Sequence, residues 1–117
     1  MKFMLLIYGD EQAAAQATPE QFQAQADAYE VFTKSIVASG NFLDGDPFQP
    51  TSTAKTVAVR DGRTTTTPGP FEATKQQLFA YYKVEADDEQ QALEMAARIP
   101  GAQTGTIEVR PVMTFDQ

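Results

Sequence analysis

Residues 3–8, Phe-Met-Leu-Leu-Ile-Tyr, form an unbroken run of apolar and aromatic side chains near the start of the chain. Because side chains alternate between the two faces of an extended strand, Phe3, Leu5 and Ile7 would lie on one face and the even-numbered residues on the other. A strand with one solvated face would alternate apolar and polar residues instead. We therefore predict a central strand with material packed on both faces of its sheet.

A second strand of the same kind is expected at residues 77–86. Alternation places its even-numbered residues from Leu78 to Val84 on one face, and Phe79 and Tyr81 on the other. Both faces are again largely apolar, so this strand is also predicted to be central. A last strand over 106–112 differs, because its apolar residues alternate with polar ones and predict one buried face.

Two helices are expected between these strands. The first begins at the Thr18–Gln21 capping box, with Pro19 at its first position, and runs to about Ser39 before Gly40. Its apolar residues recur at helical spacing and are expected to share the core face: Phe22, Ala26, Tyr29, Phe32 and Ile36. The second follows the acidic residues 87–89, ends at Pro100-Gly101, and is expected to turn Leu93, Ala96 and Ala97 inward.

The remaining segments complete the order of elements. Pro47 predicts that residues 41–48 form an edge strand or a bulge, and Asp61-Gly62 predicts a hairpin between strands 55–60 and 63–67. The order strand, helix, strand, hairpin, strand, helix, strand is that of a ferredoxin-like split βαβ fold with an inserted hairpin. At 117 residues, we expect one α+β domain over 1–117.

The helices of such a fold cover one face of the sheet only. The other face would expose the second apolar side of both central strands, and apolar patches of that size usually mark interfaces. We therefore predict a homodimer in which two sheets pack face to face as a dimeric α+β barrel.

Composition excludes several chemistries. The chain has no cysteine and no histidine, so it has no thiol or imidazole for catalysis or metal binding. Its net charge of −7 disfavours nucleic acid or an anionic membrane as a partner. The apolar run at residues 3–8 is too short for a membrane span or a signal-peptide core. We expect a cytoplasmic protein with no metal, no cofactor, no nucleic-acid partner and no membrane partner.

Three separated blocks of the sequence resemble the YCII-related proteins, in particular the branch named after a DGPF motif. They are Lys-Phe-Met-Leu-Leu-Ile-Tyr-Gly-Asp-Glu at 2–11, Pro-Gly-Pro-Phe-Glu-Ala-Thr-Lys-Gln-Gln-Leu at 68–78 and Gly-Thr-Ile-Glu-Val-Arg-Pro-Val at 105–112. The resemblance implies a dimeric α+β barrel of ferredoxin-like halves. It also implies a family of largely uncharacterised function, often encoded beside alternative sigma factors in bacteria.

The sequence departs from that family's pattern at several positions. Pro68 stands in place of the motif's aspartate, Ala73 stands where glutamate is common, and residues 79–80 replace a frequent glycine pair. Distant relatives carry a proposed catalytic histidine and aspartate, whose positions here hold Gln21 and Ala38. The resemblance therefore carries over the fold and not that acid–base chemistry, and we lean against an enzyme, with no catalytic residue nominated.

The predicted ligand-binding residues are Tyr8, Gly69, Pro70, Phe71, Lys75, Tyr81, Tyr82, Glu108 and Arg110. The three tyrosines come from central strands and would line an aromatic pocket, while Gly69 allows close backbone approach in a loop stiffened by prolines. Glu108 and Arg110 share a face of the last strand and could present a carboxylate acid beside a fixed cation. The alternatives are core aromatics, a rigid connector with Phe71 plugged into the core, and a surface ion pair.

Charge is unevenly distributed along the chain. Five basic residues lie between positions 55 and 83 against two acids, so this segment carries +3 and the rest −10: Lys55, Arg60, Arg63, Lys75 and Lys83 oppose Asp61 and Glu72. They could form an anion-binding rim, or protect the edges of the hairpin from sheet addition. Asp44 and Asp46 could bind a hard cation, although acids in such a turn more often serve the turn itself.

Three functions remain open. The first, which we favour, is binding of a small molecule in a cleft of the homodimer. The second is a non-catalytic interaction or regulatory module, linked through its gene neighbourhood to a sigma factor. The third is a structural oligomer without a ligand.

Overall fold

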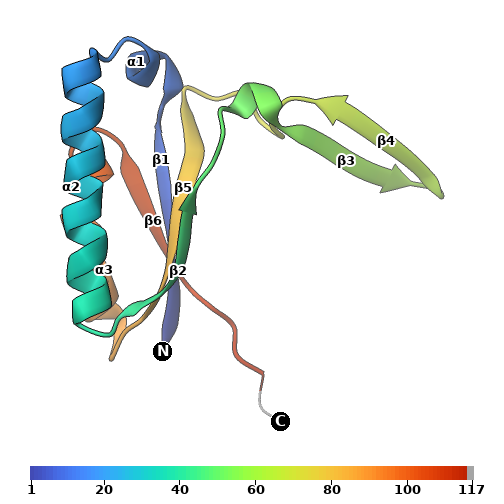
Figure 1. Ribbon diagram of the computed structural model, residues 1–117. Coiled ribbons are helices and arrows are strands. Elements are labelled where there is room, and N and C mark those ends of the chain that lie inside the picture. The colour runs from blue at the N-terminus through green and yellow to red at the C-terminus, as the bar shows by residue number, and fades with distance from the viewer. Residues whose placement is uncertain (116–117) are drawn as a thin grey trace.

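The computed structural model describes residues 1–115 and builds a four-stranded sheet, helices on one of its faces, and a hairpin that stands apart (Figure 1). The elements in chain order are β1 (Lys2–Asp10), α1 (Glu11–Ala15), α2 (Pro19–Ala38), β2 (Phe42–Pro47), the 3₁₀ helix η1 (Thr51–Thr53), β3 (Lys55–Arg60), β4 (Arg63–Pro68), β5 (Gln76–Glu85), α3 (Glu89–Arg98), the 3₁₀ helix η2 (Pro100–Gln103) and β6 (Thr106–Pro111).

The main sheet is antiparallel and has the strand order β2-β5-β1-β6. With the hairpin set aside, this order and the two helical crossovers are those of a ferredoxin-like α+β fold. The two strands that are apolar on both faces, β1 and β5, lie in the centre as predicted. β2, which contains Pro47, lies at an edge, where a residue without an N–H is tolerated.

The core lies between the sheet and the helices α2 and α3. Phe3, Leu5 and Ile7 of β1 are fully buried there, against Phe32 and Ile36 of α2. Helix α3 adds small and flexible side chains to the same layer, namely Ala92, Met95 and Ala96. Only one face of the sheet is thus covered by helices within the described residues, and we call the other the open face.

The capping box predicted for the long helix is present. The Gln21 backbone N–H donates to the Thr18 hydroxyl oxygen over 3.1 Å, and the Thr18 N–H donates to the Gln21 side chain over 2.9 Å. The helix ends at Ala38, and Gly40 follows with a φ of +80°. These contacts stop the helix where the sequence indicated.

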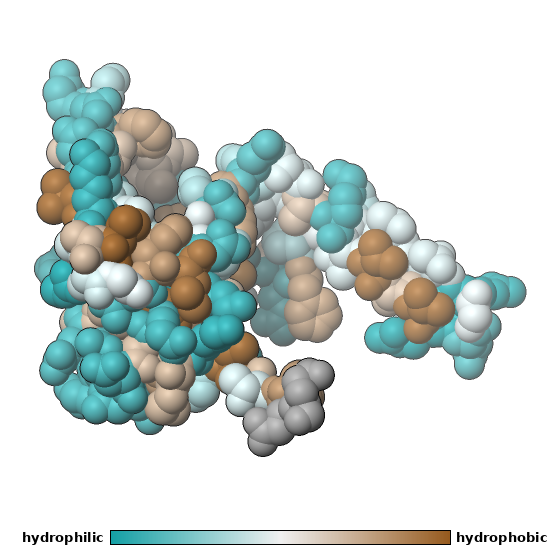
Figure 2. Space-filling view, turned by 60° about the horizontal axis from the view of Figure 1, so that its bottom comes forward, coloured by the Kyte–Doolittle hydropathy of each residue, from teal (hydrophilic) through white to brown (hydrophobic). Residues whose placement is uncertain are grey.

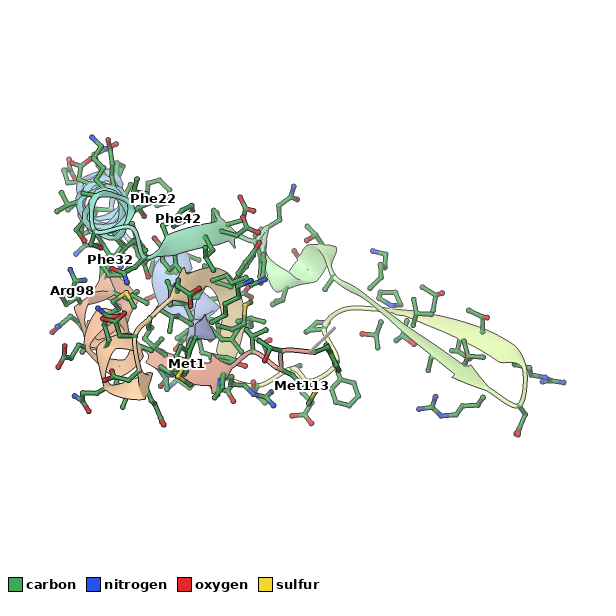
Figure 3. All side chains as sticks on the ribbon, turned by 90° about the horizontal axis from the view of Figure 1, so that it is seen from below. Met1, Phe22, Phe32, Phe42, Arg98 and Met113 are labelled. Carbon is green, nitrogen blue, oxygen red and sulfur yellow. The ribbon has the colours of Figure 1, made fainter. Side chains whose placement is uncertain are left out.

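The prediction that Phe22 lies in the core is wrong. Its side chain is 70% exposed, and Ala26 is exposed as well, because no part of the chain within residues 1–115 covers residues 19–28. Tyr29 is the first residue of α2 that packs against the core. Figure 3 shows Phe22 on α2 apart from Phe32, which lies toward α3.

The inward face of α3 also differs from the prediction. Leu93 is 42% exposed and Ala97 is exposed, whereas only Ala96 of the three expected residues is buried. The buried positions 92, 95, 96 and 99 follow helical spacing from Ala92, which sets the phase of the helix. Leu93 lies about 100° further round and faces outward.

A β-bulge changes which residues of β5 face the helices. The register shifts between Ile7 and Tyr8, so that Ile7 pairs with Ala80 while Tyr8 pairs with Leu78. Phe79 is the extra residue and packs against the core, and Leu78 moves to the open face. The simple alternation predicted for residues 78 and 79 is therefore wrong, because a bulge inverts the face of everything before it.

The short helix α1 follows β1 directly. The Asp10 carboxylate caps it by accepting from the backbone N–H groups of Gln12 and Ala13. The alanine-rich composition of residues 13–15 favours helix once that cap is in place.

The predicted hairpin is present as a separate two-stranded sheet, β3 and β4, which we call the arm. Its two-residue turn places Asp61 and Gly62 at φ values of 52° and 76°, as a type I′ turn requires. The arm extends away from the main sheet, on the side opposite the helices (Figures 1 and 3). Within residues 1–115, no helix combines the length and apolar character needed to cross a membrane.

Candidate functional site

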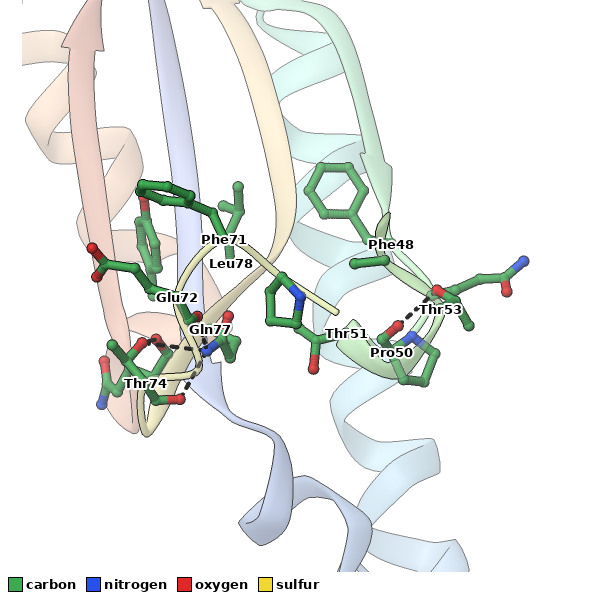
Figure 4. Close-up of a pocket in the computed structure, with 14 residues that line it drawn as sticks. Phe48, Pro50, Thr51, Thr53, Phe71, Glu72, Thr74, Gln77 and Leu78 are labelled. Atoms are coloured by element: carbon green, nitrogen blue, oxygen red, sulfur yellow. Dashed lines mark hydrogen bonds between the residues drawn. The ribbon is translucent and has the colours of Figure 1, made fainter. Parts of the chain in front are cut away.

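A cleft of about 670 Å³ lies where the chain leaves β2 for the arm and returns to β5 (Figure 4). Tyr8 and Leu78 form its floor, since they are paired neighbours on the open face. The bulge in β5 is what brings Leu78 to this face. Part of the apolar floor of the cleft is therefore formed by the β5 bulge, which strict alternation of side chains along the strand does not predict.

One wall of the cleft is the segment 48–54, which is tied to the body at two points. The Phe48 N–H donates to the Phe79 carbonyl oxygen over 2.7 Å. Thr51 donates to the Glu11 carboxylate twice, from its backbone N–H over 2.9 Å and from its hydroxyl over 2.6 Å. Hydrogen bonds to a charged acceptor are the stronger kind, so Glu11 fixes this wall.

The opposite wall is the loop 69–76. The Gln77 side-chain amide donates to the carbonyl oxygens of Glu72 and Thr74, each over 2.8 Å, and so holds the loop in shape. Phe71 sits on this loop with 85% of its side chain exposed. It is not the core plug that one reading of the sequence expected.

The polar end of the cleft is built around Tyr8. Its hydroxyl donates to Oε1 of Glu108 over 3.1 Å. Burial, and next this hydrogen bond, raise the pKa of the Tyr8 phenol, while the charge on Arg110 lowers it. At neutral pH the phenol is protonated and donates its one proton to Glu108, so its oxygen is left to accept a further hydrogen bond.

A second hollow of about 370 Å³ adjoins the first and shares Thr51, Pro70, Thr74 and Gln77 with it. Its lining includes three charged residues, Asp10, Glu11 and Lys75. The pair of hollows thus combines an apolar, aromatic part with a charged end.

The structure brings together some of the predicted site residues. Tyr8, Pro70 and Phe71 line the cleft, Lys75 lines the adjoining hollow, and Gly69 lies at its margin with a φ of +98°. Glu108 is connected to the cleft by the hydrogen bond that it accepts from the Tyr8 hydroxyl. Whether these residues bind a ligand stays a prediction.

Tyr81, Tyr82 and Arg110 lie elsewhere. Tyr82 is buried on the helix side of the sheet, where its hydroxyl lies 2.7 Å from that of Thr33, and burial raises its pKa. Tyr81 is on the open face and donates to Asp44 over 2.9 Å; this bond is the main cause of its raised pKa. The expectation of one pocket lined by all three tyrosines is therefore wrong, because residues 81 and 82 point to opposite faces.

Arg110 also lies on the open face, paired with Met4, and outside both hollows. The five basic residues of segment 55–83 do not gather into one rim either. Lys55 lies at the base of the arm, Arg60 and Arg63 flank its turn, and Lys83 is on β5.

Sequence reasoning missed the wall formed by residues 48–54 and the role of Glu11. A signal was present, since Pro47 and Pro50 together end the strand and predict an ordered connector. The hydrogen bonds between Thr51 and Glu11 join residues 40 positions apart, and no local sequence pattern predicts them.

Asp44 and Asp46 do not form a cation site with other ligands in the described part of the chain. There, no group of three or more acidic side chains is placed to hold a metal ion. Asp44 instead accepts from the Gly45 backbone N–H over 2.9 Å and from Tyr81. This is the turn chemistry that the alternative reading described.

The positions assigned to a catalytic pair in distant relatives are far apart. Gln21 and Ala38 lie near opposite ends of α2 and are separated by about 26 Å along its axis. Gln21 is occupied in the capping box. No pair of side chains at these two positions of one chain could share a proton.

The fold and cleft define an α+β protein with ferredoxin-like strand order and an inserted arm. The family model of the YCII-related domain matches residues 1–116, and the chain belongs to this family. A protein of Rhizobium meliloti (strain 1021), described as uncharacterized, is 27% identical over 117 residues, which cover 98% of this chain and 94% of that protein. The resemblance to YCII-related proteins is thus confirmed, and assignment to the DGPF branch stays a prediction.

Proposed function

We propose that this protein binds a small molecule in the cleft between β1, segment 48–54 and loop 69–76, and that it does so as a homodimer. The observation that carries the proposal is the cleft itself, since one wall is held by hydrogen bonds that the Glu11 carboxylate accepts and the other by hydrogen bonds that the Gln77 side chain donates. Ordered walls around an apolar floor are what ligand sites in proteins usually have.

The lining favours a ligand with a flat apolar part. Phe48 and Phe71 come from opposite walls, and Leu78 lies on the floor between them. Aromatic rings bind planar groups by stacking. At one end, the Tyr8 hydroxyl oxygen and the Glu108 carboxylate offer hydrogen-bond acceptors to a polar substituent that carries a donor.

The charge of the lining argues against a strongly anionic ligand. Glu72 lines the cleft and Glu108 lies behind Tyr8, while no lysine or arginine is among the residues that line the larger hollow. A neutral or cationic aromatic molecule meets fewer unfavourable charges there.

A thermal-shift screen of neutral, cationic and anionic aromatic metabolites, followed by calorimetric titration of the hits, tests this proposal. Phe71→Ala is expected to weaken binding by about tenfold or more, which corresponds to about 1.4 kcal/mol. Phe115→Ala is the matched control, because Phe115 is 76% exposed but lies on the C-terminal tail. Absence of any hit at millimolar concentration, or equal affinity of both variants, would overturn it.

The proposal of a homodimer is based on the apolar residues of the open face. Met4, Leu6, Tyr8, Leu78 and Tyr81 lie there, and none of the helices in the described part of the chain covers them. Stacked sheets pack about 10 Å apart when such faces meet. Sedimentation equilibrium measures the assembly, and a monomer at about 100 µM contradicts this part of the proposal. The cytoplasmic location remains a prediction.

A second candidate is an interaction or regulatory module, and the exposed apolar side chains of the arm favour it. Val57 and Val59 are 60% and 56% exposed. The link to a sigma factor rests on the family resemblance alone. Affinity capture with the full chain, with and without the arm, tests this role, and recovery of only the chain itself counts against it.

A further inference from the structure

The arm lies outside the core of its own chain. No residue of β3 or β4 is buried, and the least exposed are only partly covered. Figure 2 shows apolar side chains, in brown, along this isolated projection. An isolated two-stranded hairpin is at best marginally stable in water, so the arm needs a surface to pack against.

One face of the arm has the character of a contact surface. Val57 and Val59 are two residues apart and lie on the same face, opposite Thr66 and Thr64 of β4. These two threonines are their cross-strand neighbours on this face. Adjacent β-branched side chains on one face of a strand pack well against a second surface, and their apolar groups are not stabilised by exposure to water.

The exposed area of the chain is larger than that of a typical folded monomer of its mass. A folded monomer of its mass exposes roughly 6,300 Å² by the usual scaling, whereas this chain exposes 8451 Å². The excess, roughly 2,200 Å², exceeds the roughly 800 Å² that each partner of a stable complex buries. The radius of gyration, 16.3 Å, is likewise above the roughly 13 Å of a compact domain of this length.

The charges of the arm complement the rest of the chain. Residues 55–68 carry three basic side chains and one acid, while the chain as a whole is at −7. In the described part of the chain, Arg60 and Arg63 join no ion pair, and neither do Asp44 and Asp46 on β2. Basic groups on the arm and acidic groups on the body are thus available to each other across two copies.

The arm and the open face lie on the same side of the molecule (Figures 1 and 3). A two-fold axis beside the open face would therefore place each arm along the body of the other copy, and such a closed, isologous contact uses both surfaces at once. The arm, about 20 Å long, is longer than the spacing of about 10 Å between packed sheets. It can reach across the interface.

We propose that the arm clasps the second copy of this chain, with Val57 and Val59 packed against it, and that the clasped copy covers the open side of the cleft, above its floor of Tyr8 and Leu78. Ala54 and Pro70, which adjoin the base of the arm, line that cleft. This inference rests on the homodimer of the proposed function. It adds that the arm, and not the sheet face alone, holds the dimer.

The arm can be removed cleanly, because the Gly69 N–H donates to the Ala54 carbonyl oxygen over 2.7 Å and closes its base. Replacing residues 55–68 by Asn-Gly tests the arm as a whole. Val57→Lys with Val59→Lys tests its apolar face within the full chain. Val31→Lys with Val37→Lys is the matched control, because these valines are 70% and 55% exposed on α2, away from the open face.

Sedimentation equilibrium of the four proteins decides the matter, with circular dichroism to confirm that each is folded. We expect both arm variants to dimerise at least about tenfold more weakly than the intact chain and the control. If the arm variants dimerise as tightly as the intact chain, the clasp is overturned and the sheet-face dimer stands. If the intact chain is a monomer at about 100 µM, both are overturned.

Discussion

The backbone N–H of Gly101 donates a hydrogen bond of 3.1 Å to the hydroxyl oxygen of Tyr29. The contact joins the middle of α2 to η2, at the first point where that helix meets the core. An added Cβ on Gly101 would lie 2.5 Å from the same oxygen and 3.2 Å from Cγ2 of Ile7. Glycine is needed there for space, since Gly101 is buried between the two.

Gly101→Ala should lower the free energy of unfolding by about 1–3 kcal/mol, because the methyl group overpacks a filled site and displaces the Tyr29 hydroxyl. Urea denaturation followed by circular dichroism measures the change. Gly40→Asn is the control: nothing lies within 4 Å of a Cβ there, and asparagine tolerates the φ of +80°. Equal stability of Gly101→Ala and the intact chain would contradict this packing.

The same contact predicts a response to alkaline pH. Burial, partly offset by the hydrogen bond from Gly101, raises the pKa of Tyr29 from 10 to about 12. Since the raised pKa favours the neutral phenol in the folded state, its contribution is complete below pH 10 and is lost as pH rises toward 12. Tyr29→Phe should remove that part of the alkaline slope. Absorbance at about 295 nm should show one tyrosine ionising after the others.

Local patterns were sufficient for most of the fold. The double-sided apolar strands predicted the centre of the sheet, and Thr18, Pro19 and Gly40 predicted the ends of α2. The Asp61-Gly62 pair predicted the arm. These features work because each is decided by the backbone preferences of a few neighbouring residues.

The errors have a different origin. The Leu78–Phe79 inversion comes from a bulge whose extra residue is seen only when β5 is aligned with β1. The pairing of Glu11 with Thr51 is likewise decided by the approach of distant segments. The cleft depends on both, so its aromatic loop could be proposed from the sequence while its floor and one wall could not.

Phe22 and Phe32 illustrate how periodicity alone misjudges burial. They lie on one helix, yet Phe32 is 4% exposed and packs edge-on to Tyr82 with ring centroids 5.2 Å apart, while Phe22 is 70% exposed. We expect Phe32→Ala to destabilise by about 3–5 kcal/mol and Phe22→Ala to change stability by about 0.5 kcal/mol or less. Chemical denaturation of the two variants compares them, and similar losses would show that Phe22 is covered in solution.

A last prediction concerns the wall that Glu11 holds. Its carboxylate accepts both the backbone N–H and the hydroxyl of Thr51, and these two bonds are what tie η1 to the end of β1. Glu11→Ala leaves the Thr51 N–H without its charged acceptor, and the loss of such a bond costs about 1–3 kcal/mol locally. The wall should then open more often while the core, which does not contact Glu11, stays closed.

Hydrogen exchange measured by NMR separates local from global opening. The amide of Thr51 should exchange at least about tenfold faster in Glu11→Ala, while the amides of Leu5 and Val84 in the central strands keep their protection. Glu94→Ala is the control, because Glu94 is an exposed acid on α3, in neither hollow. Unchanged exchange at Thr51 would mean that Pro50 and the Phe48–Phe79 hydrogen bond suffice to hold the wall. Faster exchange would show that this carboxylate holds the wall of the cleft in place.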